Sequence, residues 1–177
     1  MAITTLNNRS INRSDTASAD QVWTATSATA SDFQAVSGGK ILQVVTVSVE
    51  SQQSTTSTSY AAITGMTLNI TPAATSSRIL LLQSGNIQVP AGPYAWFTIY
   101  RDSTDISVSA TNRGLGSSMS GTGTQQHTMA FSKIDSPSTT DEITYTVQWR
   151  TSSGSYTIYY GEPDGSTTSL TAIEIGA

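Results

Sequence analysis

The segment FSKIDSPSTTDEITYTVQWR, residues 131–150, concentrates side chains that enzymes use for acid–base and nucleophilic chemistry. The only histidine of the chain, His127, lies four residues before it. The candidate groups within the segment are Lys133, Asp135, Ser136, Asp141 and Glu142. A serine nucleophile, a histidine base and a carboxylate that orients the histidine are the parts of a hydrolytic triad. The first question is whether the fold can bring them together.

Strand geometry separates these groups. If residues 127–134 and 142–149 form a hairpin, Asp135 and Ser136 lie in its loop and His127 lies at its far end. Eight residues of strand span about 26 Å at about 3.3 Å per residue. A triad requires hydrogen-bond contacts of about 3 Å. We therefore expect no triad within this segment and assign no catalytic residue.

Acidic residues elsewhere offer two other chemistries. His127 could meet Asp102 or Glu162 from other segments, although a histidine at a strand start is more often a surface residue. The paired carboxylates are Asp102 with Asp105, Asp141 with Glu142, and Glu162 with Asp164. A glycosidase needs two carboxyl groups about 5–9 Å apart, and calcium needs six or more oxygens. Each pair adjoins Gly, Pro, Ser or Thr, where acids usually cap a turn. We expect solvated turns and neither a metal nor a cofactor.

Composition points to an all-β protein. Roughly a third of the residues are Ser or Thr, and charged residues make up 11% against about 25% in typical domains. Thr, Val, Ile and Tyr favour strands. The net charge of −4 gives no basic footprint for nucleic acid. The chain has no cysteine, which excludes disulfides and thiolate metal sites. Its longest aliphatic run, Ile79–Leu82, is too short for membrane insertion, and no signal peptide is visible.

From residue 39 the sequence reads as short strands separated by turn residues. Ile143, Tyr145, Val147 and Trp149 alternate with polar residues, which predicts a strand with one buried face. Met66, Leu68 and Ile70 share one parity, and Gly65 separates two short strands. Residues 112–126 contain four glycines and no period, which predicts a long surface loop. Eight to ten strands with turn signals every 8–12 residues predict an antiparallel β-sandwich or jelly roll over residues 39–177.

Residues 1–38 have a different texture. Isolated apolar residues stand in a Ser, Thr, Asn and Ala background without a persistent period. Either the segment is a flexible tail, or it is an extended arm that orders against a partner. Large aromatics favour the arm. The residues expected to make its contacts are Ile3, Leu6, Ile11, Trp23 and Phe33.

Aromatic residues near the strand ends suggest one binding alternative. Rings of this kind serve sugar-binding faces, ordinary cores and oligomer interfaces alike. Most of them fall inside expected strands, where core or subunit interface is the better interpretation. Tyr94 and Tyr159 are the residues we expect to be exposed and available for a surface glycan.

Several blocks resemble a domain of tailed-phage structural proteins that is frequent in marine and cyanobacterial phages. They are GKILQVV, TGMTLNITP, FTIYRDSTDI, DSPSTTDEITYTVQWR and the terminal SLTAIEIGA, in this order across residues 39–177. The resemblance implies a jelly roll of the complement-head and tumour-necrosis-factor type, assembled as a homotrimer. Residues 1–38 resemble the leaders of such virion proteins, which implies an arm that attaches to other virion proteins. The chain lacks the heptads and repetitive shaft of a long fibre.

The resemblance implies a non-enzymatic virion protein, a trimeric tail-fibre or spike component. Capsid decoration is the alternative, and a glycan-binding module or a polysaccharide depolymerase is less favoured. In a trimer, the interface would bury apolar residues that a lone sandwich exposes. Two segments are suited to that role: Ile79–Leu82, which is apolar on both parities, and the tyrosine-rich segment 156–160.

Overall fold

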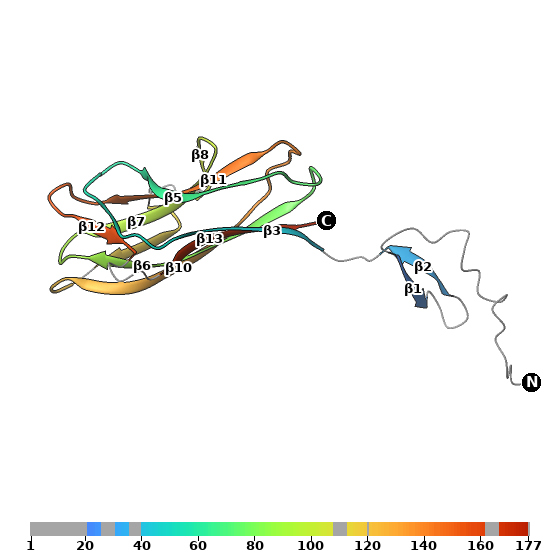
Figure 1. Cartoon of the computed structure of the whole chain (residues 1–177), viewed down its shortest axis with the longest axis horizontal. Helices are drawn as coiled ribbons and strands as arrows, with labels where there is room; N and C mark the ends of the chain where they lie inside the picture. Colours follow the sequence, from blue (N-terminus) through green and yellow to red (C-terminus); the bar gives the residue numbers. More distant parts are fainter. Residues whose placement is uncertain are drawn as a thin grey trace, which may run out of the picture. The chain divides into compact units, whose positions relative to one another are not determined.

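A computed structural model of the chain describes residues 21–25, 31–35, 40–107, 113–119, 121–161 and 167–176 (Figure 1). The chain divides into two compact units, Met1–Gly38 and Gly39–Ala177. Every helix or strand assigned in these residues is a β-strand, which confirms the predicted all-β class. Among the same residues there is no helix of the length and hydrophobicity needed to cross a bilayer.

The first unit contains one antiparallel pair of strands. Strand β1 (Gln21–Ala25) pairs with β2 (Ser31–Ala35), and Trp23 lies opposite Phe33 in the register. The irregular spacing of apolar residues did not indicate this pair, although both segments carry aromatic residues that favour strands. The other residues predicted for the arm, Ile3, Leu6 and Ile11, lie outside the described residues.

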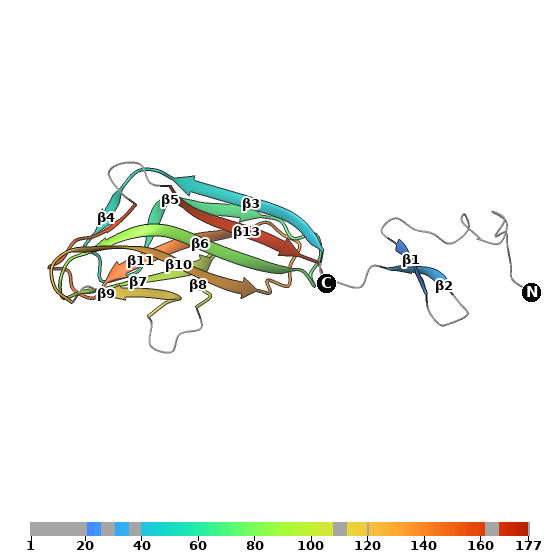
Figure 2. The ribbon, with the colours of Figure 1, turned by 90° about the horizontal axis from the view of Figure 1, so that it is seen from below.

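The second unit is built from two antiparallel sheets, drawn as two layers in Figure 1. In the first sheet the order of the long strands is β3-β13-β6-β10. The short strand β12 pairs with the C-terminal end of β6, and β4 pairs with β12. Its strands are β3 (Ile41–Val49), β4 (Gln53–Thr55), β6 (Arg78–Val89), β10 (Gln125–Asp135), β12 (Ile158–Tyr160) and β13 (Thr168–Ile175). Figure 2 shows β3, β13, β6 and β10 side by side.

The second sheet has the order β5-β11-β7, and β8 and β9 share the other edge of β7. Its strands are β5 (Ala61–Ile70), β7 (Tyr94–Arg101), β8 (Thr104–Asp105), β9 (Gly116–Met119) and β11 (Ile143–Thr151). Successive long strands mostly alternate between the sheets, as in a jelly roll. The predicted antiparallel sandwich is confirmed.

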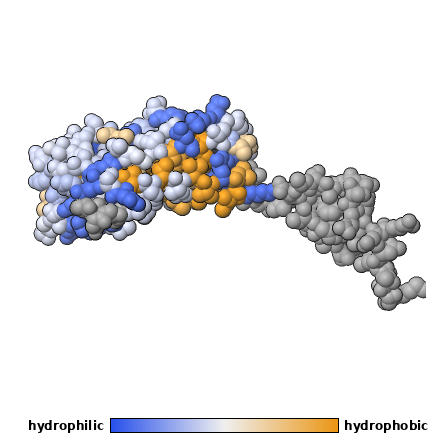
Figure 3. Space-filling model, viewed as in Figure 1, coloured by the Kyte–Doolittle hydropathy of each residue, from blue (hydrophilic) through white to orange (hydrophobic). Residues whose placement is uncertain are grey.

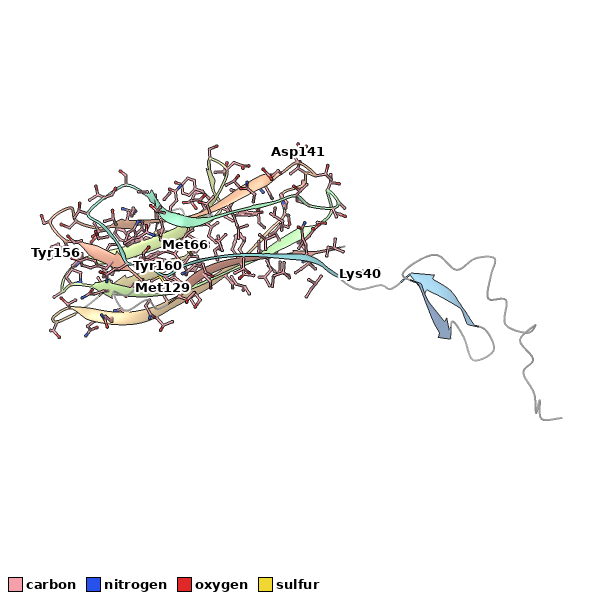
Figure 4. The ribbon with its side chains drawn as sticks, viewed as in Figure 1. Lys40, Met66, Met129, Asp141, Tyr156 and Tyr160 are labelled. Atoms are coloured by element: carbon pink, nitrogen blue, oxygen red, sulfur yellow. The ribbon has the colours of Figure 1, made fainter. Side chains whose placement is uncertain are left out.

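The core fills the space between the inward faces of the two sheets. The alternation of β11 is confirmed, because Ile143, Tyr145, Val147 and Trp149 are all buried. Trp149 packs against Phe97 of the same sheet and Tyr160 of the first sheet, with ring centroids 6.1 Å away in both cases. Figure 4 shows the labelled Met66 and Tyr160 between the two layers. An aromatic cluster therefore joins the sheets at one end of the core.

Gly85 in β6 makes room for this cluster. A Cβ atom at this position would lie 2.7 Å from the Tyr160 hydroxyl oxygen and 2.8 Å from Thr168. The Tyr160 hydroxyl instead accepts a hydrogen bond from Nε2 of the buried Gln83 on the same strand. A side chain at residue 85 would displace this buried contact.

Strands β10 and β11 do not form the expected hairpin. Strand β10 pairs with β6 in the first sheet, whereas β11 lies between β5 and β7 in the second. The segment between them crosses from one sheet to the other. Alternation fixes which face of a strand is buried, but it leaves the hydrogen-bonding partner open.

Two other expectations about local structure were wrong. The segment 112–126 is not only a loop, because it contains β9, which pairs with β7. Gly65 does not separate two strands. It lies inside β5 with a φ of 81°, opposite a register shift in β11, as expected for a bulge. The described part of the second unit has eleven strands, β3 to β13, because β4, β8, β9 and β12 are short segments held by backbone pairing.

Replacing Trp149 with Ala should lower the free energy of unfolding by about 3–5 kcal/mol, because it opens a cavity in the aromatic cluster. The matched control is Ser136→Ala, at an exposed residue of the crossover segment, where we expect a change within about 0.5 kcal/mol. Urea unfolding followed by tryptophan fluorescence and far-UV circular dichroism measures both. Equal stability of the two variants would contradict the packing described.

Candidate interaction surface

The candidate triad groups do not meet, as expected. His127 lies opposite Ile87 and Asp135 lies opposite Ile79 on the same ladder of β10 and β6, so about 26 Å of strand separates them. The predicted separation holds because both residues lie on one strand, β10, although this strand does not form the expected hairpin.

Asp135 holds the two sheets together. Its carboxylate accepts hydrogen bonds from Arg101 Nη1 at 2.9 and 3.1 Å and from the Tyr145 hydroxyl at 2.6 Å. Asp135 belongs to the first sheet, and both donors belong to the second. Burial, followed by the hydrogen bond to Asp135, raises the pKa of Tyr145 well above its ordinary value. The carboxylate that could have oriented a catalytic base is thus a structural link.

Two further acids of the described residues, Asp102 and Asp105, hold local structure. Asp102 accepts a hydrogen bond from the Thr144 backbone at 3.0 Å. Asp105 accepts one from the Thr98 hydroxyl at 2.6 Å. Glu162 and Asp164 lie outside the described residues. In the described part of the chain, no three His, Cys, Asp or Glu residues gather as metal ligands would.

His127 lines a shallow pocket between β9 and β10. The pocket volume is about 220 Å³, and its lining includes Ser117, Ser118 and Met129. The buried Nε2 atom of His127 makes no hydrogen bond. None of the residues that line the pocket is acidic, so the imidazole has no carboxylate there to orient it.

The two predicted glycan contacts lie on different sheets. Tyr94 of β7 is 44% exposed and stacks on Trp96, with ring centroids 5.7 Å apart and an interplanar angle of 3°. Tyr159 of β12 is half-buried in the first sheet. The two tyrosines therefore do not form one site.

An arginine extends the aromatic stack that begins at Tyr94. The Arg150 guanidinium carbon lies 4.1 Å from the Trp96 ring centroid and 5.1 Å from that of Tyr60, within the range of cation–π attraction. Burial raises the pKa of Tyr60, although Arg150 partly offsets the effect. Only Tyr94 of this stack presents a largely exposed ring.

Most of the exposed large hydrophobic side chains in the described residues lie on the outer face of the first sheet. A row crosses all four main strands in register, because Ile173 lies opposite both Val44 and Leu80, and Leu80 lies opposite Ile134. We call this surface, with its flanking side chains, the apolar face. It consists of Ile41, Leu42, Val44, Leu80, Leu82, Ile134, Ile173 and Ile175. Figure 3 shows hydrophobic surface gathered at the end of the sandwich nearest Lys40, which Figure 4 labels.

The apolar face is well exposed. Val44 is 56% exposed and Ile134 is 50% exposed. The sequence indicated part of it, since Ile79–Leu82 is apolar on both parities. The contributions of β3 and β13 were missed, because only the strand register places Val44 and Ile173 beside Leu80. Apolar residues on both parities in Leu42–Val45 and in Leu170–Ile175 are the signal that could have revealed them.

A buried carboxylate lies on the inner side of this sheet. Glu174 of β13 accepts hydrogen bonds from Gln43 Nε2 at 2.6 Å and from the Ala73 backbone at 2.7 Å. Gln43 also donates to the Thr71 carbonyl at 2.7 Å. Burial opposes ionisation, but the nearby Ser77 hydroxyl and the hydrogen bonds from Gln43 and Ala73 outweigh it and lower the pKa of Glu174 below its ordinary value. This network ties the loop after β5 to the two strands that carry Val44 and Ile173.

Comparisons with known proteins give fold-level similarities alone. No family model matches the chain, and no curated protein matches it. A structure of the Gt strain of infectious bursal disease virus aligns with a TM-score of 0.41 and 15% identity, covering 86% of this chain and 45% of the other. The VP2 protein of the same virus aligns with a TM-score of 0.39 and 18% identity, covering 86% of this chain and 43% of the other.

The chain thus spans less than half the length of the viral chains that it matches. At TM-scores below 0.5, these similarities establish neither a common family nor a function.

Replacing Glu174 with Gln should destabilise the protein at neutral pH by about 1–3 kcal/mol, because a buried donor loses its acceptor. The folded-state pKa is lowered, so the stabilisation by the carboxylate is present above its ordinary pKa of about 4.3. It is lost as the pH falls through the lower folded pKa. Urea unfolding from pH 7 to pH 3 should show the difference between parent and variant shrinking with acidification. A constant difference would contradict the charged network.

Proposed function

We propose that this chain is a non-enzymatic structural component of a virus particle, a homotrimeric tail-fibre or spike component of a tailed phage. Residues 1–38 attach it to other virion proteins. The resemblance of the sequence blocks to tailed-phage structural proteins supports this proposal. Two of those blocks, TGMTLNITP and DSPSTTDEITYTVQWR, supply much of β5, the crossover segment and β11. Jelly rolls recur in viral capsid domains.

The observation that carries the non-enzymatic role is how the reactive side chains are used. Asp135 links the two sheets through Arg101 and Tyr145, and Asp102 and Asp105 hold turns. The largest surface feature left without a structural role is the apolar face, which suits assembly better than chemistry.

The strand order is that of a jelly roll, the fold to which the complement-head and tumour-necrosis-factor type belongs. Four strands, β3-β13-β6-β10, lie opposite β5-β11-β7-β9, which is the order expected when eight strands in sequence fold as two Greek keys. The subtype rests on the resemblance of the sequence blocks, and that subtype supports a trimer.

The virion role is tested on particles of the phage that encodes the chain. Quantitative mass spectrometry of gradient-purified particles should find the chain, in a small multiple of three copies for a fibre or spike. A copy number comparable to that of the major capsid protein would favour capsid decoration instead. A truncated chain that lacks residues 1–38 should be absent from the purified particles. Absence of the intact chain from purified particles, with abundance in the lysate, would overturn the proposal.

A contact with host-surface glycan at Tyr94 is a second role compatible with the first. The exposed ring of Tyr94, stacked on Trp96, favours it over Tyr159. Replacing Tyr94 with Ala should weaken binding to host surface polysaccharide about tenfold, as expected for loss of one aromatic contact. Tyr159→Ala is the control and should leave binding unchanged. Biolayer interferometry with immobilised polysaccharide measures both, and equal binding by parent and Tyr94→Ala would exclude this site.

A further inference from the structure

We propose that further copies of this chain cover the apolar face, so that the same face of each copy meets at a common symmetry axis. The inference rests on the self-association in the proposed function and deepens it by naming the surface and its residues. It does not depend on where in a virus particle the assembly is placed.

The outward positions of the four main strands are almost free of charge. Strands β3, β13 and β10 present no charged side chain on this side, and β6 presents Arg78 at its very end. Depletion of charge is the compositional mark of an interface core. Because the whole chain carries a net charge of −4, two copies repel at most orientations. This uncharged face lets them approach without placing like charges opposite each other.

The rest of the outer face of the first sheet is polar, and its side chains are also suited to burial in an interface. Its outward side chains are short hydroxyl and amide groups, and several already bond to one another. The hydroxyl oxygens of Thr46 and Thr171 lie 3.0 Å apart, and the Thr128 hydroxyl donates to Asn86 Oδ1 at 3.1 Å. Burying groups with partners costs less than burying unpaired ones.

The area is sufficient for a stable interface. Four strands about 4.8 Å apart, with five outward positions about 6.8 Å apart, cover roughly 20 by 30 Å of flat sheet. The solvent-accessible area of a sheet face exceeds its flat area. The accessible area of this face is therefore close to the area that each partner buries in a standard-size interface, about 800 Å².

The described surface offers no second apolar patch for this face to meet. The exposed large hydrophobic residues outside it are Tyr94 and Tyr156. Tyr94 belongs to the second sheet, and Tyr156 lies at the opposite end of the sandwich from Lys40 (Figure 4). The apolar face of one copy therefore finds its best match in the apolar faces of other copies. In a trimer, each face would turn toward the three-fold axis and contact both neighbours there.

The decisive experiment compares full-length variants by sedimentation velocity over a wide concentration range. Val44→Glu with Ile134→Glu places two charges at exposed positions of the central row, so the monomer should still fold. We expect association at least about 100-fold weaker than that of the parent, because burying like charges at an interface costs several kcal/mol. The matched control, Ala62→Glu with Thr64→Glu, alters exposed positions of β5 on the other sheet and should associate like the parent.

A second readout locates the contact directly. The chain has no cysteine, so Leu82→Cys creates a single thiol that can carry pyrene on the apolar face. Excimer fluorescence should appear for this variant and not for Ala62→Cys labelled in the same way. Circular dichroism of every variant checks that the fold is kept.

Each outcome separates the surface from the function. An associated parent whose mass the Val44→Glu with Ile134→Glu variant leaves unchanged would overturn the proposed face, while leaving self-association and the virion role standing. In that case excimer emission would be absent, and association through the free edge of β10 or β5 would replace the proposal. A parent that stays monomeric at tens of micromolar would overturn both this inference and the homotrimer. Detection of the chain in particles tests the virion role separately.

Discussion

The structure depends on the two-residue period of its strands, which requires the inward side chains of two sheets to be apolar at once. Strand β11 shows the constraint most clearly, since every second residue from Ile143 to Thr151 is buried. Trp149, Phe97 and Tyr160 then close the core from both sheets, with ring centroids 5.8 to 6.1 Å apart. Once these inner faces are paired, the outer faces decide what the protein can do. The second sheet covers its outer face with threonines and the stack around Arg150, whereas the first sheet leaves an apolar one.

The residues with the chemistry of an active site serve this architecture. Asp135 joins the sheets, and Glu174 holds a loop against β3 and β13. Both acids have their charge satisfied by hydrogen bonds within the fold, so neither is available to a substrate. The carboxylates of Asp135 and Glu174 therefore stabilise the fold.

Alternation in the sequence predicted the fold class and the buried parity of β5 and β11, because parity is a local property. It could not predict the partner of β10, since pairing is decided by all strands together. Strand β9 was missed because a short strand depends on backbone bonds more than on side-chain pattern. Only the part of the apolar face that belongs to β6 was predicted. Ile79–Leu82 showed two apolar parities, but the row from Val44 to Ile134 exists only through the register of four strands.

We propose that the apolar face of the first sheet is an assembly surface, which an isolated sandwich leaves uncovered. The most direct measurement is the solution mass of the unmodified full chain, by multi-angle light scattering after gel filtration at several loading concentrations. The account predicts a mass of three chains that persists on dilution to the micromolar range. A mass of one chain at every concentration, in a folded protein, would contradict it.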